Sequence, residues 1–105
     1  MANRWNIPGW LEREATERDV ACVYCATAFT PLSVARRNRP SWEHIVNDAK
    51  IVTRENIVRC CVGCNASKGT KTLVAWLESK YCQDRGITRD SVASIAKAVI
   101  QKTSC

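Results

Sequence analysis

The spacing of apolar and polar residues changes several times along the chain, which predicts short helices and short strands within one small fold. Residues 10–18 carry acids and arginines at the spacings of an exposed helix face, so we expect a helix there. Residues 20–30 predict a tight hairpin, and the apolar, β-rich residues 42–46 predict a strand. A second strand is expected between residues 51 and 58, around a loop at 54–56.

The C-terminal part of the chain predicts two helices. The first begins at Asn65, and its apolar positions continue at helical spacing toward a core: Leu73, Trp76, Leu77 and Tyr81. Gly86 interrupts the pattern, and Thr88 or Asp90 can cap a last helix. The apolar face of that helix holds Val92, Ile95, Ala96 and Val99. The order predicts a small α+β domain, a β-hairpin plus a helix with flanking N- and C-terminal helices.

Composition indicates one folded domain spanning residues 1–105, because 46% of the chain is hydrophobic and its length suits a single core. The 16 lysines and arginines exceed the 10 acids, which favours an anionic partner such as DNA. The N-terminus has no apolar segment like that of a signal peptide, and no apolar run approaches the length of a membrane span. We therefore expect a cytoplasmic protein with no membrane partner.

Two C-x-x-C pairs are the strongest chemical signal in the sequence. Cys22 with Cys25 and Cys61 with Cys64 offer the four thiolates of a closed, tetrahedral structural zinc site. A secreted disulfide framework is the alternative for a chain with seven cysteines, but the paired spacing and the expected reducing compartment favour zinc. Cys60 can in principle replace Cys61, although positions 61 and 64 keep the two-residue gap of a zinc knuckle.

The only histidine, His44, lies between the two cysteine pairs and follows Glu43 directly. A zinc site completed by cysteines leaves this imidazole for other chemistry, and a neutral imidazole can take a proton from water at physiological pH. Glu43 and Asn65 supply a carboxylate and an amide oxygen, the hard donors that Mg²⁺ or Mn²⁺ prefers. These residues predict hydrolysis of a phosphodiester if the second strand returns the chain beside the first.

Three segments resemble the HNH endonucleases of the ββα-metal (His-Me finger) class. They are Cys-Val-Tyr-Cys, Glu-His-Ile-Val and Glu-Asn-Ile-Val-Arg-Cys-Cys-Val-Gly-Cys-Asn-Ala-Ser-Lys-Gly, and the resemblance covers about residues 18–71. It implies the ββα-metal fold around a four-cysteine zinc, and a metal-dependent DNA endonuclease. No reader domain is visible, so we expect low sequence specificity.

The resemblance also implies a role for each motif residue. His44 matches the general base, and Asn56 matches the middle Asn that braces the loop holding the histidine. Asn65 occupies the third motif position, which is His or Asn among relatives, and Glu43 stands where many relatives carry a metal-binding Asp. Asn47-Asp48 departs from the Pro that many relatives have after the strand, and Asp48 is a turn residue or a further acidic ligand.

Basic residues near the expected active site predict contacts with phosphates, with ordinary surface charge as the alternative: Lys68, Lys71, Arg36, Arg37 and Arg39. Two other functions stay open at this point. One is a zinc module that binds nucleic acid or protein without catalysis, and the other is the nuclease subunit of a larger phage-packaging or restriction assembly. A homodimer is a further possibility for the apolar face of the last helix.

Overall fold

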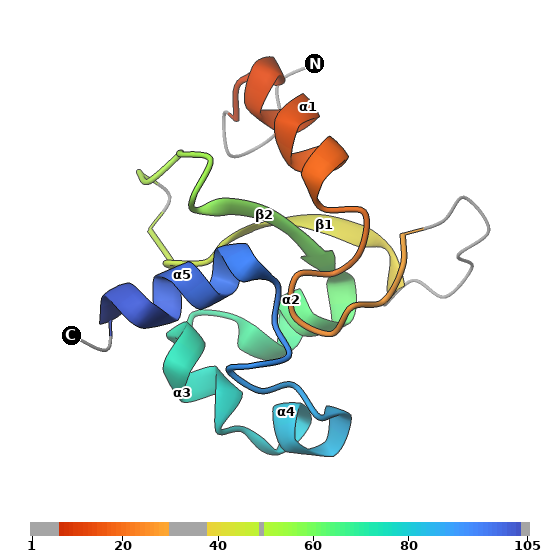
Figure 1. Cartoon of the computed structure of the whole chain (residues 1–105), viewed down its shortest axis with the longest axis vertical. Helices are drawn as coiled ribbons and strands as arrows, with labels where there is room; N and C mark the ends of the chain where they lie inside the picture. Colours follow the sequence, from red (N-terminus) through yellow and green to blue (C-terminus); the bar gives the residue numbers. More distant parts are fainter. Residues whose placement is uncertain (1–6, 30–37, 49, 104–105) are drawn as a thin grey trace.

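The computed structural model describes residues 7–29, 38–48 and 50–103 of the chain. Its helices and strands are α1 (Gly9–Arg18), β1 (Pro40–His44), β2 (Ile57–Cys61), α2 (Val62–Lys68), α3 (Leu73–Leu77), α4 (Lys80–Arg85) and α5 (Ser94–Thr103) (Figure 1). The strands pair antiparallel, with Pro40 opposite Cys61 and His44 opposite Ile57. This arrangement confirms the prediction of a small α+β domain with a β-hairpin and a following helix.

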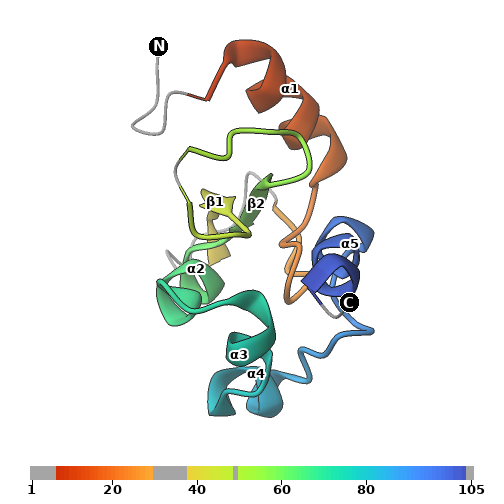
Figure 2. The same cartoon turned by 90° about the vertical axis from the view of Figure 1, so that its left-hand side faces the viewer.

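The hairpin separates two apolar clusters, because successive side chains of a strand point to opposite faces. α1 lies on one side of the hairpin, and α2, α3 and α4 lie on the other (Figures 1 and 2). On the α1 side, Leu11 and Ile57 are wholly buried and pack with Trp42. On the other side, the main core centres on Trp76 and Tyr24, whose rings meet edge to face with centroids 5.0 Å apart.

A buried carboxylate fastens the end of α1 to β2. Asp19 accepts two hydrogen bonds of 2.8 Å from the Arg18 guanidinium and one of 3.1 Å from the backbone N–H of Arg59. Arg18 also donates to the backbone oxygens of Arg54 and Ile57. The hydrogen bond to Asp19 raises the pKa of Arg18. These charged groups pair with one another. The start of the first knuckle, which is the segment that carries Cys22 and Cys25, therefore has a fixed position relative to the sheet.

The first knuckle is a hairpin closed by the bridge between Ala21 and Ala28. The backbone N–H of Cys22 donates to the oxygen of Thr27, and that of Ala26 donates to the oxygen of Cys22. The turn requires a left-handed conformation at Ala26, whose φ is +66°. The hairpin predicted for residues 20–30 is therefore present as far as the described residues extend, at Phe29.

The single helix predicted from Asn65 to Tyr81 is wrong, because three short helices replace it. Gly69, with a φ of +50°, ends α2. The Thr72 and Ser79 hydroxyls then cap new helices by accepting hydrogen bonds from Ala75 and Cys82. Local capping by hydroxyls and glycine outweighs the continuous apolar spacing. Gly86, with a φ of +67°, ends α4, as its position in the sequence suggests.

Two other boundaries differ from the prediction. Residues 51–52 lie outside β2, because the chain there forms the loop that Asn56 closes. Thr88 caps a turn rather than a helix, since its hydroxyl accepts from the backbone of Asp90 and Ser91, and α5 begins only at Ser94. Among the described residues, none of the helices combines the length and the apolar character that a membrane crossing needs.

Candidate functional site

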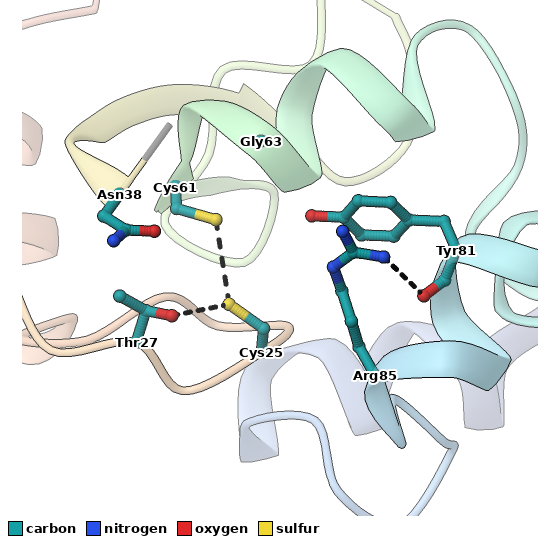
Figure 3. A pocket seen from close by; sticks show the side chains of 7 residues that line it. All are labelled: Cys25, Thr27, Asn38, Cys61, Gly63, Tyr81 and Arg85. Atoms are coloured by element: carbon teal, nitrogen blue, oxygen red, sulfur yellow. Dashed lines mark hydrogen bonds between the residues drawn. The ribbon is translucent and has the colours of Figure 1, made fainter. Parts of the chain in front are cut away.

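The four cysteines of the two C-x-x-C pairs lie together. Cys22 and Cys25 come from the first knuckle, Cys61 ends β2, and Cys64 lies in the first turn of α2. Their sulfur atoms all lie within 4.8 Å of one another, and the Cys25 and Cys61 sulfurs, which face each other in Figure 3, are 3.7 Å apart. Sulfurs bound tetrahedrally at about 2.3 Å from one zinc ion lie about 3.8 Å apart, so the cluster fits zinc.

Hydrogen bonds direct the sulfurs toward the centre of this cluster. The Cys22 sulfur accepts from the backbone N–H groups of Tyr24 and Cys25, and the Cys61 sulfur accepts from that of Cys64. Hydrogen bonds from the Cys22 and Cys64 thiols lower the pKa of Cys61. One thiolate is therefore stabilised by the protein itself, and metal binding would release the protons of the others.

Cys60 lies apart from the cluster, so the alternative in which it replaces Cys61 is not the one adopted. Its buried sulfur is 3.8 Å from the Ser41 hydroxyl. Burial raises the pKa of the Cys60 thiol, which therefore stays protonated. Within the described residues, the four-cysteine cluster is the one group of three or more histidine, cysteine or acidic side chains suited to a metal ion.

A pocket of about 490 Å³ adjoins the cysteine cluster. It is lined by Cys25, Thr27, Asn38, Cys61, Gly63, Tyr81 and Arg85 (Figure 3). The Arg85 guanidinium lies over the Tyr81 ring at 3.7 Å from its centroid, and the Tyr81 hydroxyl donates to the Cys64 sulfur. One side of the cluster thus meets solvent, while Cys22 and Cys64 are buried on the other.

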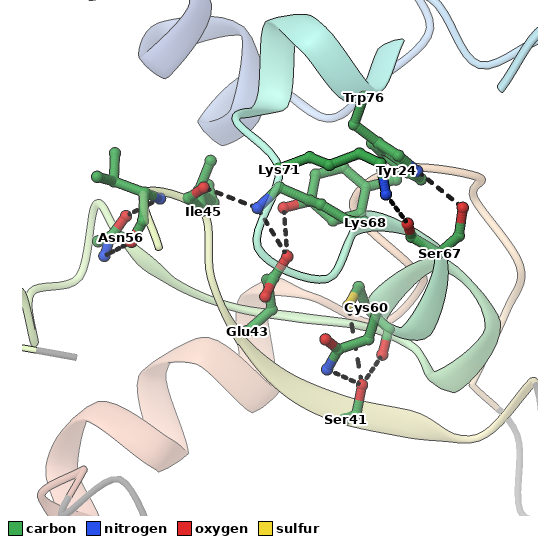
Figure 4. Close-up of polar contacts among 12 residues, drawn as sticks. Tyr24, Ser41, Glu43, Ile45, Asn56, Cys60, Ser67, Lys68, Lys71 and Trp76 are labelled. Atoms are coloured by element: carbon green, nitrogen blue, oxygen red, sulfur yellow. Dashed lines mark hydrogen bonds and ion pairs between the residues drawn. The ribbon is translucent and has the colours of Figure 1, made fainter. Parts of the chain in front are cut away.

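Glu43 is the carboxylate predicted to bind a second, catalytic metal ion. It is buried, with only 8% of the residue exposed. Its Oε2 atom lies 3.2 Å from the Lys68 Nζ atom and accepts a hydrogen bond of 3.3 Å from the Tyr24 hydroxyl (Figure 4). Burial raises the pKa of Glu43, while Lys68 and Tyr24 act in the opposite direction. The carboxylate is therefore already paired with a cation and a hydrogen-bond donor of the protein.

His44 is the last residue of β1, and the ring is buried, with 5% of the residue exposed. Residues that face each other across two strands share a face of the sheet. His44 faces Ile57 and Glu43 faces Val58, so their side chains leave the strand on opposite faces. Burial lowers the pKa of His44, which favours the neutral imidazole, while the charge of Asp48 opposes this shift.

Asn56 closes the loop that follows His44. Its Oδ1 accepts a hydrogen bond of 2.7 Å from the backbone N–H of Val46, and its Nδ2 donates to the backbone oxygens of Val46 and Ile51. Asn56 is itself buried, with 4% exposed, so water does not compete for these bonds. Such contacts are what a brace for the histidine loop requires.

Asn65 follows Cys64 directly and ties α2 to β1. Its Nδ2 donates to the Ser41 hydroxyl at 3.0 Å and to the backbone oxygen of Trp42 at 3.1 Å. Because the Nδ2 atom donates to these two acceptors, the Oδ1 atom of the same amide points in another direction. These two hydrogen bonds hold Asn65, the neighbour of Cys64 in the cysteine cluster, beside the strand that carries Glu43 and His44.

The basic residues that were predicted to contact phosphates differ in their exposure. Lys71 and Arg39 are exposed, as a contact with DNA requires. Arg36 and Arg37 lie outside the described residues. The prediction for Lys68 is wrong, because this residue is 0% exposed and its ammonium binds Glu43 and the backbone oxygen of Ile45.

Sequence reasoning missed the buried group formed by Tyr24, Glu43 and Lys68. One signal was present, since Lys68 stands four residues after Cys64, and such residues share a helix face. A face that carries a zinc ligand points inward. Tyr24 gave no comparable signal, because the interior positions of a C-x-x-C turn tolerate many residue types.

No family model, no curated protein and no solved structure matches this chain.

Proposed function

We propose that the chain is a metal-dependent DNA endonuclease of the HNH type, built on a four-cysteine zinc scaffold. The observation that supports this best is the arrangement around β1 and β2. The strand that ends at His44, the Asn56 brace and the helix that carries Asn65 follow one another in a hairpin–helix unit. A hydrolytic site needs a positioned base and nearby oxygen donors, and this unit offers His44 as the base with Glu43 and Asn65 as the donors. Residues that only stabilise turns would not need to follow one another in this way.

In this proposal, His44 is the general base that takes a proton from the attacking water. A pKa lowered by burial suits this role, because the ring is then neutral at physiological pH. Asn56 holds the loop that carries the histidine, so the ring keeps its position while DNA binds. Asp48 is exposed and its charge acts on the ring, so a phosphate would reach the histidine from this part of the loop.

The divalent cation, Mg²⁺ or Mn²⁺, would be held by the Glu43 carboxylate and the Asn65 amide oxygen. Both are hard oxygen donors, which is the chemistry that such ions prefer. When bound, the cation would neutralise charge on the phosphate and on the leaving oxygen. Lys71 and Arg39 would contact neighbouring phosphates, and low sequence specificity is expected from contacts of this kind.

A zinc module without catalysis is the second candidate, and the burial of Glu43 and His44 favours it. In that case the ion pair of Glu43 with Lys68 is part of the core, and basic surface residues bind nucleic acid or protein. A third candidate is a nuclease subunit of a larger phage-packaging or restriction assembly, which would have the catalytic residues but would cut DNA only within that assembly.

A plasmid assay separates these candidates. Supercoiled DNA is incubated with the zinc-loaded chain in Mg²⁺, in Mn²⁺ and without added divalent cation. The proposal predicts nicked circles only with Mg²⁺ or Mn²⁺. An EDTA sample needs a zinc measurement afterwards, because loss of the structural ion would also stop cutting. DNA binding without nicking under every condition would favour the zinc module.

A further inference from the structure

Lys68 is wholly buried, which is rare for lysine because a charged ammonium loses its hydration when it leaves water. Only a specific set of partners makes such burial tolerable. Lys68 lies in the last turn of α2, on the same helix face as the zinc ligand Cys64. The fold therefore places this ammonium inside the molecule, beside β1.

Two oxygens receive the Lys68 ammonium. Its Nζ atom lies 3.2 Å from Glu43 Oε2 and donates a hydrogen bond of 2.9 Å to the backbone oxygen of Ile45 (Figure 4). The Tyr24 hydroxyl donates to the same Glu43 oxygen at 3.3 Å. Charge and hydrogen bonding at Glu43 are thus largely satisfied by the protein itself.

We propose that the Lys68 ammonium occupies the cation position beside Glu43 in the resting chain, so that a divalent cation binds there only by displacing it. This inference rests on the proposed function, which makes Glu43 a metal ligand. An ammonium and a divalent cation held against one buried carboxylate repel each other strongly, since a protein interior screens charge poorly. Lys68 therefore lowers the metal affinity of the site.

Binding of Mn²⁺ to zinc-loaded protein, followed by the electron paramagnetic resonance signal of free Mn²⁺, tests this directly. Lys68→Gln removes the charge but keeps an amide that can donate to Glu43 and Ile45. Zinc content and circular dichroism establish that the variant is folded before its affinity is compared. We expect Lys68→Gln to bind Mn²⁺ at least about tenfold more tightly than the unmodified chain. Lys71→Gln, which changes an exposed lysine on the same segment, is the matched control and should leave the affinity unchanged.

The double variant Lys68→Gln with Glu43→Gln should lose the gain, which assigns the bound ion to Glu43. Equal or weaker binding by Lys68→Gln would overturn the proposal, as would the absence of Mn²⁺ binding in both proteins. A second measurement needs no substitution. Acetic anhydride should acetylate buried Lys68 much more slowly than exposed Lys71, and saturating Mn²⁺ should increase the Lys68 rate selectively. An unchanged Lys68 rate with Mn²⁺ bound would contradict displacement.

Failure of this inference can be distinguished from failure of the proposed function by adding the plasmid assay. Tighter Mn²⁺ binding by Lys68→Gln, with no nicking by either protein, would support the Lys68 proposal and reject the nuclease. Nicking by the unmodified chain, with no gain in Mn²⁺ affinity in Lys68→Gln, would support the nuclease and reject the Lys68 proposal.

Discussion

The cysteine cluster and the end of β1 are both candidate cation sites, but the protein assembles them differently. At the cluster, four sulfurs from two distant segments converge within 4.8 Å. At the end of β1, Glu43 and His44 leave the strand on opposite faces, and Glu43 pairs with Lys68. The four sulfurs are a donor set that suits zinc, whereas the Glu43 carboxylate at the β1 site is already paired with a cation of the protein. Under the proposed function, the first would hold a permanent ion and the second an exchangeable one.

Replacing Cys61 with serine should have the largest effect. Structural zinc in small domains binds with roughly 10–16 kcal/mol of apparent free energy, and this binding is coupled to folding. We expect Cys61→Ser to lose zinc and its cooperative unfolding transition, measured by metal analysis and circular dichroism. Cys82→Ala is the matched control, because Cys82 is buried in the core outside the cluster and its loss should leave zinc bound. A folded Cys61→Ser protein with full zinc content would contradict the scaffold role.

The next effect concerns the brace at the β1 site. Asn56→Ala removes the three hydrogen bonds that this buried amide makes to the backbone of the loop, so it should cost about 2–4 kcal/mol of unfolding free energy. Zinc content should stay unchanged, because the loop lies apart from the cysteines. Denaturant unfolding measures the loss, and Asn47→Ala on the exposed part of the loop should change stability by less than about 0.5 kcal/mol. Equal effects of the two substitutions would remove Asn56 as the brace.

A third test uses pH. Burial lowers the pKa of His44 in the folded chain below 6.5, so the unfolded chain binds a proton first as the pH falls. Stability should therefore decrease as the pH falls below about 6.5 and level off once the folded histidine is also protonated. His44→Gln should lack this component. The difference between the two proteins at each pH cancels the contribution of the cysteines, and a pH-independent difference would show that His44 does not titrate differently on folding.

The smallest expected effects lie in the backbone near each region. Ala26 has a φ of +66° in the first knuckle, so Ala26→Gly should stabilise the chain by up to about 1 kcal/mol. Gly86 has a φ of +67° and no atom near the position of an added Cβ, so Gly86→Ala should destabilise by about 1 kcal/mol through the backbone alone. Denaturant unfolding measures both, and a less stable Ala26→Gly protein would exclude strain at the knuckle.

The sequence predicts the hairpin and the cysteine cluster because both depend on short-range rules. The C-x-x-C spacing sets the sulfur positions within each knuckle, and the β-rich residues around His44 favour a strand. Local residues also indicate where α2 ends and where α3 and α4 begin: Gly69 ends α2, and the hydroxyls of Thr72 and Ser79 cap α3 and α4. Apolar periodicity alone hides these breaks, because consecutive short helices can keep one face toward the same core.

The buried ion pair of Glu43 and Lys68 could not be predicted in the same way. Which face of a helix points inward depends on the packing of the whole domain, and α2 has only 7 residues. A lysine near an expected active site is ordinarily read as a phosphate contact. Here its fixed distance from Cys64 on the helix places it in the interior, opposite Glu43.

The most direct test of the account is the rate of plasmid nicking by His44→Ala relative to the unmodified chain, both with full zinc content and in Mg²⁺. The account predicts nicking by the unmodified chain and a loss of at least about 100-fold in the variant, because the general base is gone while the scaffold persists. Equal nicking rates in the two proteins would contradict it.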